Sequence, residues 1–448
     1  MPLYTLPTPF LNLHRAMAPP KHVLALLLLL FSATNACHQR AKTLHIPVVH
    51  RDAVFPPPPY AKRGSLLTRR FAAADTALMT SGLHSPVMSG LPFESGEYFA
   101  SIGVGTPSTT ALLVIDTGSD LVWLQCKPCR HCYAQMSPLY DPRRSSTYSQ
   151  IPCTSPQCPL LQGCDNSTGG CGYTMVYGDG SSSNGNLATD RLVFSNDTSV
   201  YNITIGCGHD NEGLFDSSAG LLGVARGAAS FASQVVPSYG SYFAYCLGDR
   251  TSNVRSNSSY LVFGRTPELP STAFTPLLSN PRRRNLYYVN LAGFSVGGER
   301  VTGFSNSSLS LDPASGRGGI VVDSGTSISR FPRDAYGALR DAFDARAAAG
   351  GMRRLSGHIS VFDACYDMRG VAMAKVPQIV LHFAGGADMA LPPENYFIPE
   401  DTGNGKYYCL ALEATDDGLS VLGNVQQQGF RVVFDVEKER VGFAPTGC

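Results

Sequence analysis

Two stretches of this chain share one construction, an apolar run that ends in an aspartate on a tight turn. They are Leu113-Val114-Ile115-Asp116-Thr117-Gly118-Ser119 and Ile320-Val321-Val322-Asp323-Ser324-Gly325-Thr326. Aliphatic and β-branched residues favour a buried strand, and the glycine lets the backbone fold back at once. One Asp-Thr-Gly marks an ordinary turn. Two such stretches in different halves of the chain predict a pair of aspartates, each at a strand end inside the protein.

Other repeats surround these aspartates at similar spacing. Gly220-Leu221-Leu222-Gly223 ends 107 residues after the first aspartate, and Ser420-Val421-Leu422-Gly423 ends 100 residues after the second. The strand-like segments 96–107 and 286–298 precede the two aspartates in the same way. The chain therefore reads as an internal duplication. Two related β lobes would bring their strand-end carboxylates face to face at the junction, where large ligand clefts tend to lie.

Composition agrees with a mainly β protein. The 45 glycines and 31 prolines supply turns between short strands, and 43% hydrophobic against 15% charged residues excludes a disordered chain. We expect a bilobal fold of two duplicated β-barrel-like lobes with an active-site cleft between them. A helix is expected from about Pro332 to Ala349, where an Ala-rich run stops at Gly350-Gly351.

A pair of carboxyl groups within hydrogen-bonding distance cannot both ionise, so the two share one proton. The ionised member can then deprotonate a water molecule while the protonated member donates to a substrate carbonyl. Asp116 and Asp323 are the candidate catalytic residues, and peptide-bond hydrolysis by this route needs no metal or cofactor.

The residues beside each aspartate suit a supporting role. The hydroxyls of Thr117 and Ser324 are placed to lock the two loops together. Those of Ser119 and Thr326 can hydrogen-bond the outer carboxylate oxygens. Gly118 and Gly325 complete the two turns.

The first 90 residues differ from the rest. Arg15 and Lys21 precede an apolar run too short to span a bilayer, which predicts a signal peptide over residues 1–36. Residues 37–90 carry seven basic and two acidic residues, whereas residues 91–448 carry 26 basic and 32 acidic ones. These opposite net charges, +5 and −6, predict a prosegment that covers an acidic cleft and is released when carboxylates protonate. A disordered linker is the alternative. We expect the N-terminal lobe at 91–285 and the C-terminal lobe at 286–448.

The two aspartate motifs and two further features of the sequence together resemble a known protein family. Both aspartate motifs, Trp123 seven positions after Asp116, and the later Tyr177-Gly178-Asp179-Gly180-Ser181 are similar to those of the pepsin-like aspartic proteases, over essentially everything after Gly96. The resemblance implies that Tyr177 and Gly178 belong to a flap that closes over the substrate. It also implies that Trp123 hydrogen-bonds the Tyr177 hydroxyl. An ordinary hairpin tyrosine is the alternative role for Tyr177.

Of the 13 cysteines, Cys37 lies at the signal boundary, and the other twelve are an even number, as expected for disulfides in an oxidising compartment. Cys126, Cys129 and Cys132 alone could form a metal loop, but secretion favours bridges. The cysteine-rich insert between Asp116 and Tyr177 resembles that of the nepenthesin-type plant proteases. That resemblance implies the pairs Cys126–Cys129, Cys132–Cys207, Cys153–Cys171, Cys158–Cys164, Cys246–Cys448 and Cys365–Cys409.

The expected surroundings are extracellular. Five Asn-x-Ser/Thr sequons, at Asn166, Asn196, Asn202, Asn257 and Asn306, suit a secreted glycoprotein. Between Asp323 and Cys448 there is no room for the saposin-like domain of typical plant vacuolar enzymes, so the chain resembles the atypical plant group. We expect secretion to the apoplast in preference to plastid or vacuole, with no membrane segment and no lipid anchor.

The sequence therefore predicts a secreted, acid-active aspartic endopeptidase made as a zymogen. Expected partners are protein or peptide substrates and pepstatin-type inhibitors, and the chain is expected to be a monomer. A net charge of +1 gives no reason to expect nucleic acid. The rival is a catalytically silent inhibitor or carbohydrate-binding protein on the same scaffold, like the cereal xylanase inhibitors, which lose part of the catalytic set.

Overall fold

The computed structural model describes residues 43–50, 96–156, 158, 163–165, 169–194, 198–215, 217–248, 259–400, 407–416 and 418–445. The signal-peptide prediction lies outside these residues, as does the predicted prosegment except for Thr43–His50. All of the described residues belong to one compact unit that begins at Lys42.

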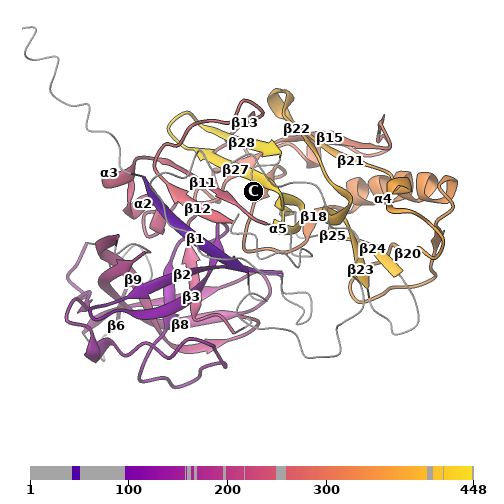
Figure 1. The fold of residues 1–448 in the computed structure, drawn as a ribbon. Coiled ribbons are helices and arrows are strands. Elements are labelled where there is room, and N and C mark those ends of the chain that lie inside the picture. The colour runs from indigo at the N-terminus through magenta and orange to yellow at the C-terminus, as the bar shows by residue number, and fades with distance from the viewer. Residues whose placement is uncertain are drawn as a thin grey trace, which may run out of the picture. The chain divides into compact units, whose positions relative to one another are not determined.

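The described strands confirm the expected mainly β fold (Figure 1). Fifteen strands form one large sheet. Fourteen of them follow one another in a single order, and β5 is attached to it by pairing with β8. In sheet order the other strands are β13 (Ala273–Pro276), β28 (Arg440–Pro445), β27 (Phe430–Asp435), β11 (Tyr242–Cys246), β12 (Tyr260–Phe263), β1 (Leu44–His50), β2 (Tyr98–Val104), β3 (Thr109–Asp116), β10 (Gly220–Gly223), β4 (Val122–Gln125), β9 (Ser199–Glu212), β8 (Ser182–Val193), β7 (Gly170–Val176) and β6 (Cys164–Asp165), with β5 at Ser149–Gln150.

Three smaller sheets come from the second half of the chain. The first contains β14 (Tyr288–Val289), β17 (Ile320–Val322), β26 (Ser420–Leu422), β18 (Ser329–Pro332) and β25 (Leu412–Thr415). The second contains β16 (Glu299–Arg300), β15 (Leu291–Val296), β21 (Ile379–Phe383) and β22 (Asp388–Ala390). The third contains β19 (Arg353–Arg354), β20 (Cys365–Asp367), β24 (Tyr407–Leu410) and β23 (Phe397–Glu400).

The longest described helix is α4 (Arg333–Ala349), which agrees with the helix expected from Pro332. It packs Leu339 and Phe343 into the core. The other described α-helices are one turn long: α2 (Phe231–Gln234), α3 (Val236–Tyr239) and α5 (Asn424–Gln427). No helix among the described residues is long and apolar enough to cross a membrane.

The duplication is visible in how each aspartate-bearing strand is paired. β3, which ends at Asp116, runs parallel to β10, and β17, which precedes Asp323, runs parallel to β26. β10 and β26 lie in the repeated segments Gly220–Gly223 and Ser420–Gly423 found in the sequence, which we call the two Leu-Gly repeats. Each aspartate is therefore held at a strand end by its own copy of the same two-strand unit.

The large sheet also crosses the lobe boundary expected at residue 285. β27, from the end of the chain, pairs with β11, and β28 pairs with β13 (Figure 1). The described part of the predicted prosegment lies in this sheet as well, because β1 pairs with β12 on one side and β2 on the other.

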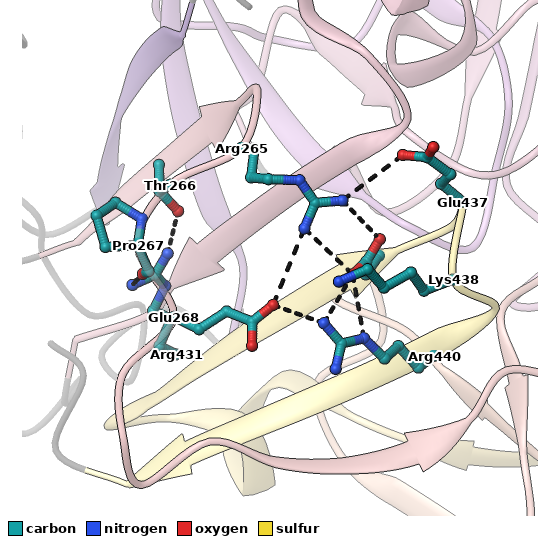
Figure 2. A network of polar contacts seen from close by, with 9 residues as sticks. Arg265, Thr266, Pro267, Glu268, Arg431, Glu437, Lys438 and Arg440 are labelled. Atoms are coloured by element: carbon teal, nitrogen blue, oxygen red, sulfur yellow. Dashed lines mark hydrogen bonds and ion pairs between the residues drawn. The ribbon is translucent and has the colours of Figure 1, made fainter. Parts of the chain in front are cut away.

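An ion-pair cluster joins the end of β27 to the neighbouring segments of the chain. Figure 2 shows the side chains of Arg265 and Arg440 pointing toward the end of this strand. The Asp435 carboxylate is buried and contacts Arg265 Nη2 at 3.2 Å and Arg440 Nη2 at 2.9 Å. Lys438 Nζ lies 4.0 Å from the Asp435 carboxylate, and Glu268 also contacts Arg440 Nη2. Burial alone would raise the pKa of Asp435, but the hydrogen bonds and charges of the two arginines outweigh it and lower this pKa. We call Asp435 with Arg265 and Arg440 the arginine cluster.

Four of the expected disulfide pairings are wrong. The structure has Cys126–Cys207 and Cys129–Cys132, where we expected Cys126–Cys129 and Cys132–Cys207. Strand register decides this, because β4 runs parallel to β9 with Leu124 opposite Cys207, and the N–H of Cys126 donates to Gly208 O at 2.9 Å. Cys126 is thereby placed beside Cys207.

The second correction concerns the insert near β6 and β7. The bonds are Cys153–Cys164 and Cys158–Cys171, where we expected Cys153–Cys171 and Cys158–Cys164. The hairpin of β6 and β7 sets Cys164 opposite Cys171, so the path of the preceding loop across the hairpin selects the partners.

Two pairings remain. Cys365 bonds Cys409, as expected, across neighbouring strands β20 and β24. Cys246 is disulfide-bonded, and its expected partner Cys448 lies outside the described residues. The described cysteines of the insert are thus joined to one another or to β9, which leaves no free thiolate among them for a metal loop.

Candidate active site

The two aspartate loops are tied to each other by two hydroxyl side chains from opposite halves. Thr117 Oγ1 donates to Val322 O at 2.9 Å and accepts the Ser324 N–H at 2.9 Å. Ser324 Oγ donates to Ile115 O at 2.7 Å and accepts the Thr117 N–H at 3.1 Å. Both residues are fully buried. These reciprocal bonds are the lock expected from the sequence.

Each carboxylate is oriented by its own loop. Asp116 Oδ1 accepts the Gly118 N–H at 2.8 Å and its Oδ2 accepts the Ser119 hydroxyl. Asp323 Oδ1 accepts the Gly325 N–H at 2.9 Å and its Oδ2 accepts the Thr326 hydroxyl at 2.7 Å. The same two kinds of donor therefore hold both aspartates.

The glycines allow the two carboxylates to approach. A Cβ on Gly118 would lie only 2.7 Å from Asp323 Oδ2, and a Cβ on Gly325 would collide with Asp116 Oδ1. Neither position has a backbone conformation that requires glycine, so the need is for space. Each loop is thus shaped around the carboxylate of the opposite half.

Electrostatics match a pair that shares a proton. Asp116 is only 5% exposed, and its carboxyl is coupled electrostatically to that of Asp323. Burial, followed by the charge of Asp323, raises the pKa of Asp116 to about 7, against the lowering effect of Ser119 and Gly118. One of the two carboxyls therefore keeps its proton at acid pH while the other can ionise.

The predicted flap is the hairpin of β7 and β8. Its turn contains Tyr177, whose N–H donates to Ser181 O at 2.8 Å, and exposed Gly178. Trp123 Nε1 donates to the Tyr177 hydroxyl at 2.6 Å, the contact that the resemblance implied. Burial, together with the charge of nearby Asp116, raises the pKa of Tyr177 well above its usual value. The hairpin tip therefore stands close to the carboxyl pair.

Phe215 was missed by the sequence interpretation. Its ring lies edge-on to Trp123, with centroids 5.0 Å apart, and edge-on to Tyr177 at 5.6 Å. Tyr133, from the cysteine-rich insert, packs on the same ring at 5.1 Å. An apolar residue shortly before the first Leu-Gly repeat was the available signal. The insert thereby contributes an aromatic ring to the wall beside the flap.

Asp120, one residue past the first motif, was also missed. Its carboxylate accepts the Gly227 N–H at 2.7 Å and the Asn285 side-chain amide at 2.9 Å. Burial raises the pKa of Asp120. This carboxyl thus ties the Asp116 loop to Asn285, where the lobe boundary was expected.

Of the five sequons, the structure describes two. Asn202 is exposed in β9 at a positive φ of 58°, and Asn306 is exposed at the start of a short 3-10 helix. Asn166, Asn196 and Asn257 lie outside the described residues.

Comparison with known proteins agrees with this geometry. The chain matches the family models described as Xylanase inhibitor N-terminal, over residues 98–265, and Xylanase inhibitor C-terminal, over residues 286–445. Aspartyl protease family protein 2 of Arabidopsis thaliana is 50% identical over 82% of this chain and 74% of its own length. Aspartic proteinase nepenthesin-1 of Nepenthes gracilis is 36% identical over 86% of this chain and 85% of its own.

The chain belongs to the nepenthesin-type plant aspartic proteases. It is thus an aspartic-type endopeptidase of the pepsin-like class, with peptides as its substrates. Solved structures show the same fold. The crystal structure of edgp has a TM-score of 0.66 at 22% identity, covering 81% of this chain and 94% of that one. Basic 7S globulin from soybean has a TM-score of 0.62 at 19% identity, covering 79% and 94%.

Proposed function

We propose that this plant protease is a secreted, acid-active endopeptidase in which Asp116 and Asp323 activate a water molecule between them. The observation that carries the proposal is the facing carboxyl pair, in which burial and the second carboxylate raise the pKa of Asp116 to about 7. In acid such a pair holds one proton and one negative charge. It can therefore act as base and acid in the same step.

In the proposed reaction the ionised carboxylate takes a proton from water, and the water oxygen bonds the peptide carbonyl carbon. The protonated carboxyl gives its proton to the carbonyl oxygen, which yields a tetrahedral diol. When the C–N bond breaks, the amine nitrogen takes a proton from the dyad and the diol loses one to it. Water is consumed, and the pair returns to its starting charge.

Tyr177, Trp123 and Phe215 supply the other side of the proposed substrate cleft. The flap turn carries Gly178 and Gly180, of which Gly180 has a φ of +87° that favours glycine. A glycine-rich hairpin tip suits a cover that closes over an extended peptide and excludes water from the reacting carbonyl.

Secretion and zymogen synthesis rest on the sequence of the first 90 residues. The apolar run before residue 36 supports export, and the basic segment 37–90 supports a prosegment that is released in acid. The exposed sequons at Asn202 and Asn306 suit the secretory route. We propose the apoplast as the destination of a monomeric enzyme.

The test is cleavage of an unfolded globin by the purified zymogen after a shift to about pH 3 to 4, near the ordinary pKa of carboxyl groups. Pepstatin is added in one arm, and Asp116→Asn replaces the wild type in another. Exposed Glu394 offers the matched control Glu394→Gln, the same carboxyl-to-amide change away from the pair. We expect cleavage by wild type and Glu394→Gln that pepstatin or Asp116→Asn abolishes.

The family models name xylanase inhibitors, so a silent inhibitor is the second candidate. Folded wild-type protein that cleaves nothing from neutral to strongly acid pH would favour that candidate. Against it stand the complete pair of aspartate loops and the tyrosine of the flap, which an inhibitor has no need to keep.

A further inference from the structure

The two halves support their catalytic loops differently. In the first half, the residues after the Leu-Gly repeat bind the Asp116 loop through the backbone. The N–H of Val224 donates to Asp116 O at 2.8 Å, and that of Ala225 donates to Ser119 O at 3.0 Å.

In the second half this pattern is shifted by one residue. Asn424, which corresponds to Val224, donates its N–H to Thr326 O at 2.7 Å, and Val425 donates to Ser327 O at 3.1 Å. Thr326 corresponds to Ser119 and not to Asp116. The carbonyl of Asp323 therefore does not receive the backbone N–H that the carbonyl of Asp116 receives.

Gln427 takes the place of that backbone donor. Its side-chain Nε2 donates to Asp323 O at 3.1 Å and to Leu422 O at 2.8 Å. Its Oε1 accepts the hydroxyl of Tyr245 on β11. Gln427 and Tyr245 are fully buried, so the amide cannot exchange these partners for water. The second catalytic loop is thereby connected to the large sheet.

Asn424 holds the next carbonyl of the same loop. Its Nδ2 donates to Ser324 O at 3.0 Å, and the residue is fully buried. Ser324 is the hydroxyl that locks the two loops together. Two side-chain amides thus hold the successive carbonyls of Asp323 and Ser324.

We propose that Gln427 and Asn424 are positioning residues that set the distance of the Asp323 carboxylate from Asp116. This inference rests on the proposed catalytic role of the pair. A loop whose buried carbonyl loses its donor must move to find another, because an unsatisfied buried carbonyl is unfavourable. A displacement of about 1 Å at reacting groups can lower the rate about a hundredfold.

Gln426 provides a matched control on the same short helix. It is equally buried, and it binds Ser329, Asn395 O and Ala411 O, none of which belongs to the catalytic loop. Gln426→Met removes at least as many hydrogen bonds as Gln427→Met. A purely structural role for these glutamines predicts that both variants behave alike.

The experiment measures kcat and KM on a quenched fluorescent peptide, together with the unfolding temperature, for the full chain activated in acid. For Gln427→Met we expect kcat to fall about 10- to 100-fold with KM within about twofold of the wild type. For Gln426→Met we expect an equal or larger drop in unfolding temperature and a kcat within about threefold of the wild type.

Gln427→Glu serves as the conservative variant. Burial favours the neutral carboxyl in acid, which can still donate one hydrogen bond, so its kcat should lie between those of wild type and Gln427→Met. If Gln427→Met does not fold, Gln427→Glu and Gln426→Glu are compared in the same way.

An active wild type whose Gln427 variants keep kcat, or lose it only in parallel with the Gln426 variants, overturns the inference alone. An inactive wild type overturns the proposed function and the inference with it.

Discussion

Two buried carboxylates of this protein, Asp116 in the carboxyl pair and Asp435 in the arginine cluster, have opposite surroundings. Asp116 faces a second carboxylate, a hydroxyl and an N–H, and its pKa rises to about 7. Asp435 contacts two guanidinium groups, and its pKa is lowered. Burial raises the pKa of both carboxyls, and at Asp116 it is the largest contribution. At Asp435 the hydrogen bonds and charges of the two guanidinium groups outweigh burial, so the neighbours decide whether its effect persists.

The difference suits the acid activity that we propose. A carboxyl pair needs one proton and one charge, whereas a structural ion pair must stay fully charged. The arginine cluster joins β27 and β28 to the segment after β12 (Figure 2). The part of the sheet that carries no chemistry therefore keeps its charges at a pH where the pair is protonated.

We expect the largest loss of activity when the two carboxyls of the pair are forced apart. Gly118→Ala places a methyl group against Asp323 Oδ2, and Gly325→Ala places one against Asp116 Oδ1. We expect each to lower kcat/KM on a peptide by about 10³-fold or more. Gly337→Ala on α4, where the methyl meets nothing within 4 Å, is the control and should keep full activity. Activity retained in both loop variants would contradict the close approach.

The raised pKa of Asp116 also predicts how the stability of the folded chain depends on pH. The pKa of Asp116 is higher in the folded than in the unfolded chain, so between about pH 4 and pH 7 the folded state binds more protons. Its contribution to stability is therefore present in acid and lost as the pH rises towards the folded-state pKa of about 7, by up to about 4 kcal/mol.

Denaturant unfolding at pH 4, 5.5 and 7 measures this, with Asp116→Asn as the comparison. The variant cannot ionise at this position and should show a flatter dependence. A wild type and a variant with parallel stability curves would show that Asp116 does not titrate in this range.

Asp435→Asn tests the other side of the comparison. It leaves Arg265 and Arg440 without their shared carboxylate, and we expect a loss of about 2 to 4 kcal/mol in the free energy of unfolding at pH 7. Partial exposure of the two arginines, 41% and 24%, keeps the loss below that of a fully buried pair. Because the pKa of Asp435 is lowered, this stability should persist well into the acid range and decline only as the pH falls through that pKa.

Arg333→Ala is the control for Asp435→Asn. It breaks an exposed pair with Asp416, so its effect on the free energy of unfolding should be far smaller than that of Asp435→Asn. Equal losses in the two variants would remove the distinction between the arginine cluster and an ordinary surface pair.

The smallest expected effect concerns the flap. Tyr177→Phe removes one hydroxyl that accepts from Trp123 and lies near Asp116. We expect kcat/KM to fall about 3- to 10-fold, the value of one hydrogen bond, with unchanged thermal stability. A fall as large as that of Gly118→Ala would mean that Tyr177 takes part in the proton transfers themselves.

Much of the site could be predicted because its signals are local. An apolar run that meets Asp-Thr-Gly must turn at the aspartate, so the strand ends at Asp116 and before Asp323 followed from sequence. The duplication then predicted that the two would meet, and the loop-locking hydroxyls of Thr117 and Ser324 followed from their positions. Gln427 gave only a weak signal, a run of glutamines where the first half has Arg226-Gly227-Ala228.

The disulfides show where local reasoning fails. Cys126, Cys129 and Cys132 are spaced so closely that each could reach several partners, and the parallel register of β4 with β9 chose Cys207 for Cys126. The arginine cluster also depends on the pairing of distant strands. Arg265 and Asp435 lie 170 residues apart in the chain, so no local pattern predicted their contact.

The sequence by itself determined the mainly β duplication, the two strand-end aspartates with their hydroxyl supports, and the helix at Arg333–Ala349, because these depend on residues within a few positions of one another. Only the tertiary structure decided how the copies differ. The one-residue shift at Asn424, the amide of Gln427 under Asp323 and the opposite pKa shifts of Asp116 and Asp435 all depend on which distant groups become neighbours. Hydrogen bonds and charges act through space over a few ångströms, and the order of residues in a chain does not specify those distances.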